Sequence, residues 1–407
     1  MSDYKWKIYS FIVSLLSKLI VPFILVKLVN PSDSGAWFSL VAALNVLSFT
    51  QFGMPVIIQR RAAYLKSANT IGPINYLIDK YRLKLALSSI VVFSVVALLS
   101  VKADYLVLIV ILSSYVFLIS ASSLIEYTFN GIGDYLSISK INFQHDLLLL
   151  LFQIVLILIF PNIISLSFAY LFTALFKYYL LRYRSKFLSE TQALNGKRDP
   201  EFEKLFLRDS FKEWLPGLSS FLLNRTDLIL VSSIFGLVAV NEFYAHSIVG
   251  ALLLGVLSSM SAIFVPKYTI SIADGNNKKA LMFFTRIFIL FGLAVVFAGL
   301  VGIFFGEWLL LRWMNIAFDI ELFILFLLIV LFDGMGRLFY AYITANNALV
   351  FHKQAVVLAL INIILSLFFL KFWGIKGILY ATLFCHFSFG FIYGYYQFKR
   401  LKNYNGI

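Results

Sequence analysis

Long runs of apolar residues alternate with short polar segments along the chain. Runs of about 18–25 residues match a helix that crosses a bilayer, because the hydrocarbon core is about 30 Å thick. Twelve such runs can be marked, and each predicts a membrane-spanning helix. They are 8–29, 35–58, 84–101, 105–127, 143–160, 163–182, 213–236, 242–265, 281–305, 318–343, 350–371 and 375–397. No soluble domain is needed to account for the length of 407 residues.

The composition agrees with this pattern. Hydrophobic residues make up 61% of the chain and charged residues only 13%, whereas about 25% of a soluble domain is charged. The sequence therefore predicts an all-α polytopic membrane protein with about twelve transmembrane helices.

Lysine and arginine are concentrated in alternate connections between the runs. By the positive-inside rule, the connections rich in these residues face the cytoplasm, which places both termini there. The basic set contains Lys5 and Lys7, the segments 60–84, 182–212 and 267–279, and the residues from Lys399 to Lys402. This asymmetry accounts for most of the net charge of +14, so the charge does not indicate binding to nucleic acid.

The longest polar segment divides the chain into two sets of six spans. It predicts an N-terminal lobe at 1–182, a cytoplasmic linker at 183–212 and a C-terminal lobe at 213–407. Six spans in each half give both halves the same orientation, as a parallel repeat requires. Moving the first half along the second by 207 residues places Lys18 over Arg225.

Lys18 lies near the middle of the first apolar run. A cation at that depth costs about 2.5–3.5 kcal/mol on insertion scales, so it is expected to face protein or water and not lipid. Ser10, Ser14 and Lys18 are spaced four residues apart and fall on one helical face. We therefore expect Lys18 and Arg225 to line a polar seam between the lobes.

Other ionisable residues lie inside the predicted spans. Asp333 and Arg337 are four residues apart and can pair on one helical face, with Gly334 and Gly336 allowing close packing. Asp227 and Asp333 are the candidates for ion coupling or charge pairing. Lys18, Arg225 and Arg337 outnumber these two carboxylates, and such a balance favours an anion, for example a diphosphate, as the substrate headgroup.

Four uncharged polar residues are candidates for sugar contacts, although such residues also hold helices together. They are Asn45, Gln51, Gln153 and Asn224. A further group (Glu126, His145, Asp146 and Lys177) lies near predicted cytoplasmic helix ends, where snorkelling makes charge inexpensive.

Motifs of catalysis and metal binding are not found in the sequence. The single cysteine, Cys385, excludes an intrachain disulfide, and the four histidines are not at metal-ligand spacing. We expect no metal, no cofactor and no enzymatic activity.

Two stretches resemble polysaccharide flippases of the Wzx type. The segment VPFILVKLVNPSDSGAWFSLVAALNVLSFTQFGMPVIIQRRA (21–62) is similar to the opening of that family. The segment NRTDLILVSSIFGLVAVNEFYAHSIVGALL (224–253) is similar to its seventh and eighth helices. The likeness extends over the chain in span count and in the position of the linker.

The resemblance implies the fold of the multidrug/oligosaccharidyl-lipid/polysaccharide exporter superfamily, with two pseudo-symmetric six-helix bundles around a central cavity. It implies a flippase that moves undecaprenyl-diphosphate-linked oligosaccharide (O-antigen or capsule repeat units) across the bacterial inner membrane by alternating access. Lys18, Arg225 and Arg337 match the cationic lumen of that family by position. Its implied partners are the lipid-linked glycan, the bilayer, and the polymerase and chain-length proteins of the pathway.

Two alternatives remain. One is a cation-coupled multidrug exporter of the same fold, for which an acid-rich cavity would be expected. The other is a polysaccharide polymerase or ligase, which is less favoured because the only large loop is predicted to be cytoplasmic.

Overall fold

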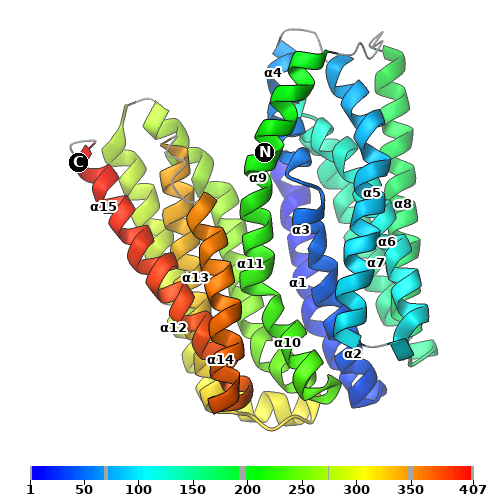
Figure 1. The fold of residues 1–407 in the computed structure, drawn as a ribbon, viewed down its shortest axis with the longest axis vertical. Coiled ribbons are helices and arrows are strands. Elements are labelled where there is room, and N and C mark those ends of the chain that lie inside the picture. Colours follow the sequence, from blue (N-terminus) through cyan, green and yellow to red (C-terminus); the bar gives the residue numbers. More distant parts are fainter. Residues whose placement is uncertain are drawn as a thin grey trace. The chain divides into compact units, whose positions relative to one another are not determined.

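The computed structural model describes residues 2–67, 72–101, 103–191, 199–273, 275–346 and 352–404. Within these ranges the regular structure is helical (Figure 1). The first half contains α1 (Ser2–Leu28), α2 (Pro31–Ala43), η1 (Leu44–Val46), α3 (Leu47–Thr50), α4 (Met54–Ser67), α5 (Gly72–Val101), η2 (Ala103–Tyr105), α6 (Leu106–Gly131), α7 (Tyr135–Ile159) and α8 (Ile163–Thr191). The second half contains α9 (Pro200–Asn224), α10 (Thr226–Phe235), α11 (Leu237–Ala273), α12 (Asn277–Met314), α13 (Ile320–Ala345), α14 (His352–Cys385), η3 (His386–Tyr393) and α15 (Gly394–Tyr404).

The helices reproduce the predicted spans once their breaks are considered. Nine helices in the described ranges are long and apolar enough to cross a membrane, or eleven if each bent helix pair counts as one span. The bent pairs are α2–α3 with α4, and α9 with α10. The last of the nine, Gln354–Lys402, has 49 residues and would be about 70 Å long as one straight helix. Because this is more than twice the hydrocarbon thickness, it must contain two spans.

Gly374 divides this last segment. Its φ of 58° and ψ of −138° interrupt α14, and residues on either side of it contact each other, with Thr382 Oγ1 donating to Asn362 Oδ1 at 3.2 Å. The chain therefore reverses direction at Gly374. This turn confirms the expectation of about twelve transmembrane helices.

The described chain forms two compact units. Unit 1 consists of Met1–Phe221 and Leu228–Val240, and unit 2 of Leu222–Asp227 and Asn241–Ile407. The predicted lobes at 1–182 and 213–407 stay a prediction. Within the predicted linker, α8 extends to Thr191 and α9 begins at Pro200.

Unit 1 is held together by apolar packing and by hydroxyl groups between helices. Helix α6 packs against α4, α5 and α8, and α7 packs against α1 and α8. Ser89 Oγ donates to Thr50 Oγ1 at 2.8 Å and lies 3.1 Å from Ser120 Oγ. Such contacts satisfy polar groups where water is absent and fix the helices relative to one another.

Helix α9 is tied to unit 1 by ion pairs at the end that carries the basic connections. Arg61 Nη2 lies 2.8 Å from Asp209 Oδ2, and Lys80 Nζ lies 2.5 Å from the oxygen of the buried Glu203. The beginning of the second half of the chain is therefore anchored on α4 and α5 of the first.

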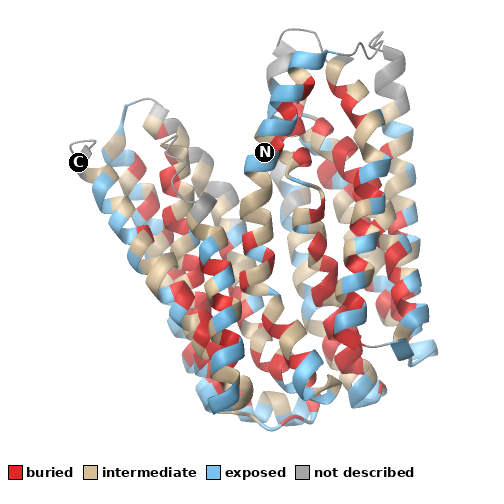
Figure 2. Ribbon diagram, in the orientation of Figure 1, coloured by how far each residue is buried: buried red, intermediate tan, exposed pale blue. Residues whose placement is uncertain are grey.

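Unit 2 is organised around an aromatic core. Phe284, Phe291, Phe339 and Tyr342 are buried in one cluster formed mainly by α12 and α13. By contrast, large apolar side chains on the opposite face of α12 are exposed, for example Phe297 (69%) and Phe304 (76%). Figure 2 shows this division between buried and exposed positions along the helices. Exposed apolar side chains of this kind suit contact with lipid.

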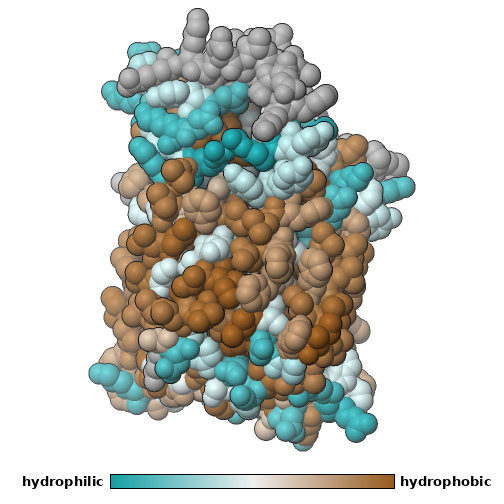
Figure 3. All heavy atoms as spheres, turned by 90° about the vertical axis from the view of Figure 1, so that its right-hand side faces the viewer, coloured by the Kyte–Doolittle hydropathy of each residue, from teal (hydrophilic) through white to brown (hydrophobic). Residues whose placement is uncertain are grey.

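The view in Figure 3 shows a belt of hydrophobic atoms between two hydrophilic ends. This distribution is what a bilayer requires of a protein surface, with apolar side chains at the depth of the hydrocarbon and polar groups at its two boundaries. The protein is therefore a multi-pass membrane protein.

The turn at Gly374 predicts a stability effect that depends on backbone conformation alone. A Cβ atom at Gly374 would meet nothing within 4 Å, and the same is true of Gly292 in α12, whose φ is not positive. We expect Gly374→Ala to lower the free energy of unfolding by about 1–3 kcal/mol, because only glycine adopts this conformation without strain. Gly292→Ala should be neutral or stabilising by up to about 1 kcal/mol. Thermal unfolding of the two purified variants in detergent tests this expectation. Equal midpoint temperatures of unfolding for Gly374→Ala and Gly292→Ala would contradict it.

Candidate functional site

Arg225 lies at a break in the seventh predicted span. Helix α9 ends at Asn224, α10 begins at Thr226, and the two axes differ by 40°. The Thr226 hydroxyl donates to the carbonyl oxygen of Leu222 and so satisfies one acceptor near the break. In transporters, helices interrupted near the midplane commonly form substrate and ion sites. Arg225 is exposed, and its position therefore makes it a candidate for contact with a substrate.

Asp333 and Arg337 form a bidentate ion pair on α13. Arg337 Nε lies 3.0 Å from both carboxylate oxygens of Asp333, and Nη2 lies 2.8 Å from Oδ2. The carboxylate is buried, whereas 49% of the Arg337 side chain is exposed. The predicted pairing is present, and it leaves the guanidinium group partly accessible.

Glycine residues around Asp333 allow the surrounding helices to come close. A Cβ atom at Gly334 would lie 2.2 Å from the Phe291 ring, and one at Gly336 would lie 2.9 Å from the Cα atom of Gly390. Helix α13 therefore packs directly on α12 and on η3. This packing brings His386, the first residue of η3, to Asp333, with His386 Nδ1 3.7 Å from Oδ1.

Arg225 belongs to the same cluster. It interacts electrostatically with Asp333, Arg337 and Tyr244. The charges of two guanidinium groups therefore act on one carboxylate, and protonation of the buried His386 would add a further positive charge. The cluster formed by Arg225, Asp333, Arg337 and His386 has an excess of positive charge within unit 2.

Asp227 lies in a different environment, although it is only two residues from Arg225. Its buried Oδ2 accepts a hydrogen bond from Thr382 Oγ1 at 2.8 Å. Its Oδ1, the Nδ2 of Asn362 and the Oγ of Ser366 have no hydrogen-bond partner among the described residues. A buried carboxylate with one unsatisfied oxygen is costly unless it takes up a proton or a cation. Asp227 therefore has the features of an ion-coupling residue, whereas Asp333 is already neutralised by Arg337.

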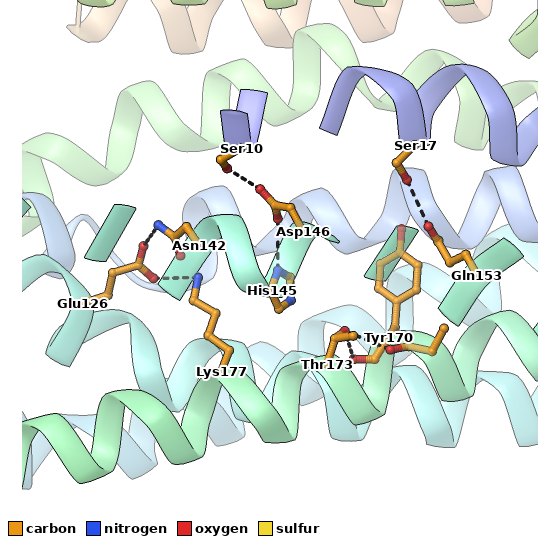
Figure 4. Close-up of polar contacts among 11 residues, drawn as sticks. Ser10, Ser17, Glu126, Asn142, His145, Asp146, Gln153, Tyr170, Thr173 and Lys177 are labelled. Atoms are coloured by element: carbon orange, nitrogen blue, oxygen red, sulfur yellow. Dashed lines mark hydrogen bonds and ion pairs between the residues drawn. The ribbon is translucent and has the colours of Figure 1, made fainter. Parts of the chain in front are cut away.

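Lys18 lies in unit 1, in the middle of the continuous helix α1, and is exposed. Helix α1 runs parallel to α7, since Ser10 Oγ donates to Asp146 Oδ2 at 2.5 Å and Ser17 Oγ to Gln153 Oε1 at 3.0 Å, both across 136 residues (Figure 4). These two hydrogen bonds fix the rotation of α1. Lys18 is thereby kept on the face that also carries Ser10 and Ser14.

The charged residues near the beginning of α7 pair with one another. Lys177 Nζ lies 2.8 Å from Glu126 Oε2, Asn142 Nδ2 donates to Glu126 Oε1 at 2.8 Å, and His145 Nδ1 lies 3.1 Å from Asp146 Oδ1. Figure 4 shows these contacts joining α6, α7 and α8. Only 12% of the Lys177 side chain and 16% of the Glu126 side chain are exposed, and the expected snorkelling of these residues to the cytoplasmic boundary stays a prediction.

The four predicted sugar contacts are dispersed. Asn45 Nδ2 donates to the carbonyl oxygens of Val41 and Ala42, and the buried Gln153 accepts from Ser17. Gln51 is the half-buried residue that ends α3, and Asn224 is the last residue of α9. The bonds of Asn45 are local to its own helical segment, and the bond of Gln153 joins α7 to α1. The role of all four residues in binding sugar stays a prediction.

The structure thus brings Arg225, Asp333 and Arg337 together, separates Asp227 from them, and places Lys18 in the other compact unit. Sequence reasoning did not identify His386, Asn362 and Thr382. The sequence did contain one indication of a role for His386, because an ionisable residue inside an apolar run is unusual. Asn362 and Thr382 are recognisable only from the turn at Gly374, which brings them together.

Metal-binding chemistry finds no support in this geometry. The described residues contain no group of three or more histidine, cysteine, aspartate or glutamate side chains that could hold a metal ion.

No protein-family model and no curated protein matches this chain by sequence. Its fold, however, is similar to solved transporter structures over nearly its full length. An inward-facing multidrug resistance MATE family transporter of the MOP superfamily is 14% identical, with 97% of this chain and 99% of that chain covered and a TM-score of 0.69. MATE in complex with MaL6 is 13% identical, with coverages of 99% and 97% and a TM-score of 0.65.

A third similar structure is a MOP superfamily transporter from Pyrococcus furiosus, for which a reversed polarity of the binding pocket has been taken to suggest a different function. It is 13% identical, with 98% of this chain and 97% of that chain covered and a TM-score of 0.62. These likenesses show that the chain has the fold of MATE family transporters, which confirms the predicted all-helical, two-lobed fold class.

The ion pair on α13 predicts a non-additive effect on stability. Arg337→Ala should lower the free energy of unfolding by about 3–5 kcal/mol, because it leaves the buried Asp333 carboxylate without its partner. The double variant Asp333→Asn, Arg337→Gln should lose less, because it removes both charges. Unfolding in detergent by titration with sodium dodecyl sulfate gives these values. A double variant less stable than Arg337→Ala would contradict the assignment.

Proposed function

We propose that this protein is a flippase of the Wzx type that moves undecaprenyl-diphosphate-linked oligosaccharide repeat units across the bacterial inner membrane. Transport proceeds by alternating access, in which the site is open first to one side of the membrane and then to the other. The glycan serves O-antigen or capsule assembly, and the polymerase and chain-length proteins of that pathway are the expected partners. The protein transports and does not catalyse a covalent reaction.

The observation that carries this proposal is the cationic excess at the break in the seventh span. Arg225 and Arg337 are both exposed, and both interact electrostatically with the single carboxylate of Asp333. Exposed guanidinium groups at membrane depth are too costly to face hydrocarbon. Guanidinium groups bind phosphate oxygens through charge-assisted, often bidentate hydrogen bonds. A diphosphate headgroup therefore complements this cluster. Lys18, in unit 1, is a separate candidate for contact with the headgroup.

The same fold supports a second candidate, a cation-coupled multidrug exporter. Its specific support is the likeness to a multidrug resistance MATE family transporter. An exporter of organic cations would need an anionic site, whereas the cluster around Asp333 has the opposite charge. The charge balance therefore favours the flippase.

Loss of the gene separates the two candidates. For a flippase, deletion should abolish the surface glycan on a gel, and lipid-linked repeat units should accumulate on the cytoplasmic side. Complementation with Lys18→Ala or Arg225→Ala should restore little glycan. A hydrogen bond to a charged group contributes about 1.5–3 kcal/mol, so each change should slow transport about ten-fold or more.

Lys27→Ala is the matched control, since Lys27 lies in the last turn of the same helix α1 and is also exposed. It should restore the glycan fully at equal protein abundance. A normal glycan in the deletion strain, together with new sensitivity to cationic drugs, would show that the protein is an exporter.

We further propose that Asp227 couples transport to an ion gradient by binding a proton or a small cation. In proteoliposomes, Asp227→Asn should remove the acceleration that an imposed proton or sodium gradient gives to transport. Asp104→Asn, in η2 outside the buried clusters, should keep it. An unchanged response to both gradients in Asp227→Asn would refute the role of this carboxylate.

A further inference from the structure

A polar cavity of about 380 Å³ lies within unit 1, between the beginning of α1 and the beginning of α7. This volume falls at the small end of the range for small-molecule sites, about 300–1,000 Å³. Its polar lining comes from four helices and includes Ser10, Ser14, Gln59, Asn130, Asn142 and Asp146. None of these six was among the predicted sugar contacts.

Hydrogen bonds and an ion pair with neighbouring residues fix the side chains that line the cavity. Asn142 donates its Nδ2 to Glu126, which in turn pairs with Lys177 of α8. On the other side, Ser10 donates to Asp146. The polar groups are therefore positioned by bonds that do not involve a ligand, as a pre-formed site requires. Figure 4 shows Ser10, Asn142 and Asp146 together with these supporting residues.

One buried atom in the wall has hydrogen-bonding capacity to spare. Asn142 Oδ1 is buried and has no hydrogen-bond partner among the described residues. Its amide is oriented by the bond from Nδ2 to Glu126, so this acceptor cannot turn to find another partner without breaking that bond. Because this acceptor is buried below the cavity surface, the groups available to a ligand are the other polar side chains of the lining.

The chemistry of the lining favours an uncharged ligand rich in hydroxyl groups. Amide side chains both donate and accept hydrogen bonds, and so do serine hydroxyls. Asp146 adds an acceptor and disfavours an anion, so this cavity is not the diphosphate site. Aromatic side chains, Phe11 and Tyr135, complete the lining. Hydroxyl, amide and carboxylate groups beside aromatic rings match the alternating polar edges and apolar faces of a sugar.

The cavity is continuous with the face of α1 that carries Lys18. Ser10 and Ser14 line the cavity, and Lys18 follows Ser14 after one helical turn, about 6 Å further along the axis. A diphosphate bound by Lys18 would thus have the polar cavity beside it on the side of the predicted cytoplasmic end of α1. In an undecaprenyl-diphosphate-linked glycan, the group attached to the diphosphate is a sugar.

We propose that this cavity binds the sugar residues next to the diphosphate of the lipid-linked repeat unit. The inference rests on the proposed function and adds a second recognition element to it. Lys18 recognises the charged headgroup, whereas the cavity between α1, α4, α6 and α7 recognises the glycan. The protein thereby distinguishes a completed glycolipid from undecaprenyl diphosphate without sugar.

Binding to the purified full-length protein in lipid nanodiscs tests this inference. The probes are lipid-linked repeat units extracted from the deletion strain and undecaprenyl diphosphate without sugar. The variant is Gln59→Leu with Asn130→Leu, which removes two polar groups of the lining and leaves the Glu126–Lys177 pair intact. Asn75→Leu, on α5 outside the cavity, is the matched control.

The double variant should bind the glycolipid about thirty-fold more weakly, since it loses two hydrogen bonds that each contribute about 1 kcal/mol. Its affinity for undecaprenyl diphosphate should be unchanged, and the control should match the wild type with both lipids. Lys18→Ala should weaken the binding of both lipids.

Three results would overturn the inference, and they have different meanings. Unchanged glycolipid binding by the double variant would refute the sugar site but leave the proposed function intact. An equal loss for both lipids would show that the two residues support the structure and do not contact sugar. Wild-type protein that binds neither lipid would refute the proposed function and the sugar site with it.

Discussion

The central physical constraint on this structure is that polar groups placed in hydrocarbon must be satisfied within the protein. The chain carries arginine, aspartate, histidine and lysine inside its apolar spans, and two of its carboxylates there are compensated by a cation. Asp333 is paired by Arg337, and Glu126 by Lys177. The helix breaks and the glycine contacts bring these side chains together. Arg225, at one such break, joins the Asp333–Arg337 pair.

Where compensation is incomplete, the structure indicates function. Asp227 has an oxygen without a hydrogen-bond partner among the described residues, Asn142 has a similar acceptor, and Arg337 remains half exposed although it is paired. A buried polar group without a partner is costly, and an exposed guanidinium group can bind a phosphate oxygen. In the proposed function, Asp227 takes up a proton or a cation and Arg337 contacts the diphosphate.

Hydropathy predicted the spans well because a helix needs about 20 consecutive apolar residues to cross the hydrocarbon core of a bilayer. The Asp333–Arg337 pair was also predictable, since a separation of four residues places two side chains on one helical face. The turn at Gly374 was predicted, since Gly374 lies in the connection between the predicted spans 350–371 and 375–397. The break at Arg225 was not predicted, because it lies inside the predicted span 213–236 and the lipid-facing and protein-facing sides of such helices differ little in hydropathy. For the same reason the partners of Asp227, Thr382 and Asn362, could not be identified from their positions in the sequence.

Translocation by the purified protein in proteoliposomes tests the central claim most directly. Lipid-linked repeat units and an organic cation would be offered to the same preparation, and the appearance of each on the opposite side of the membrane would be measured. The account predicts that the lipid-linked repeat unit crosses with wild-type protein, that Arg225→Ala abolishes this transfer, and that the cation does not cross. Transfer of the cation without transfer of the glycolipid would contradict it.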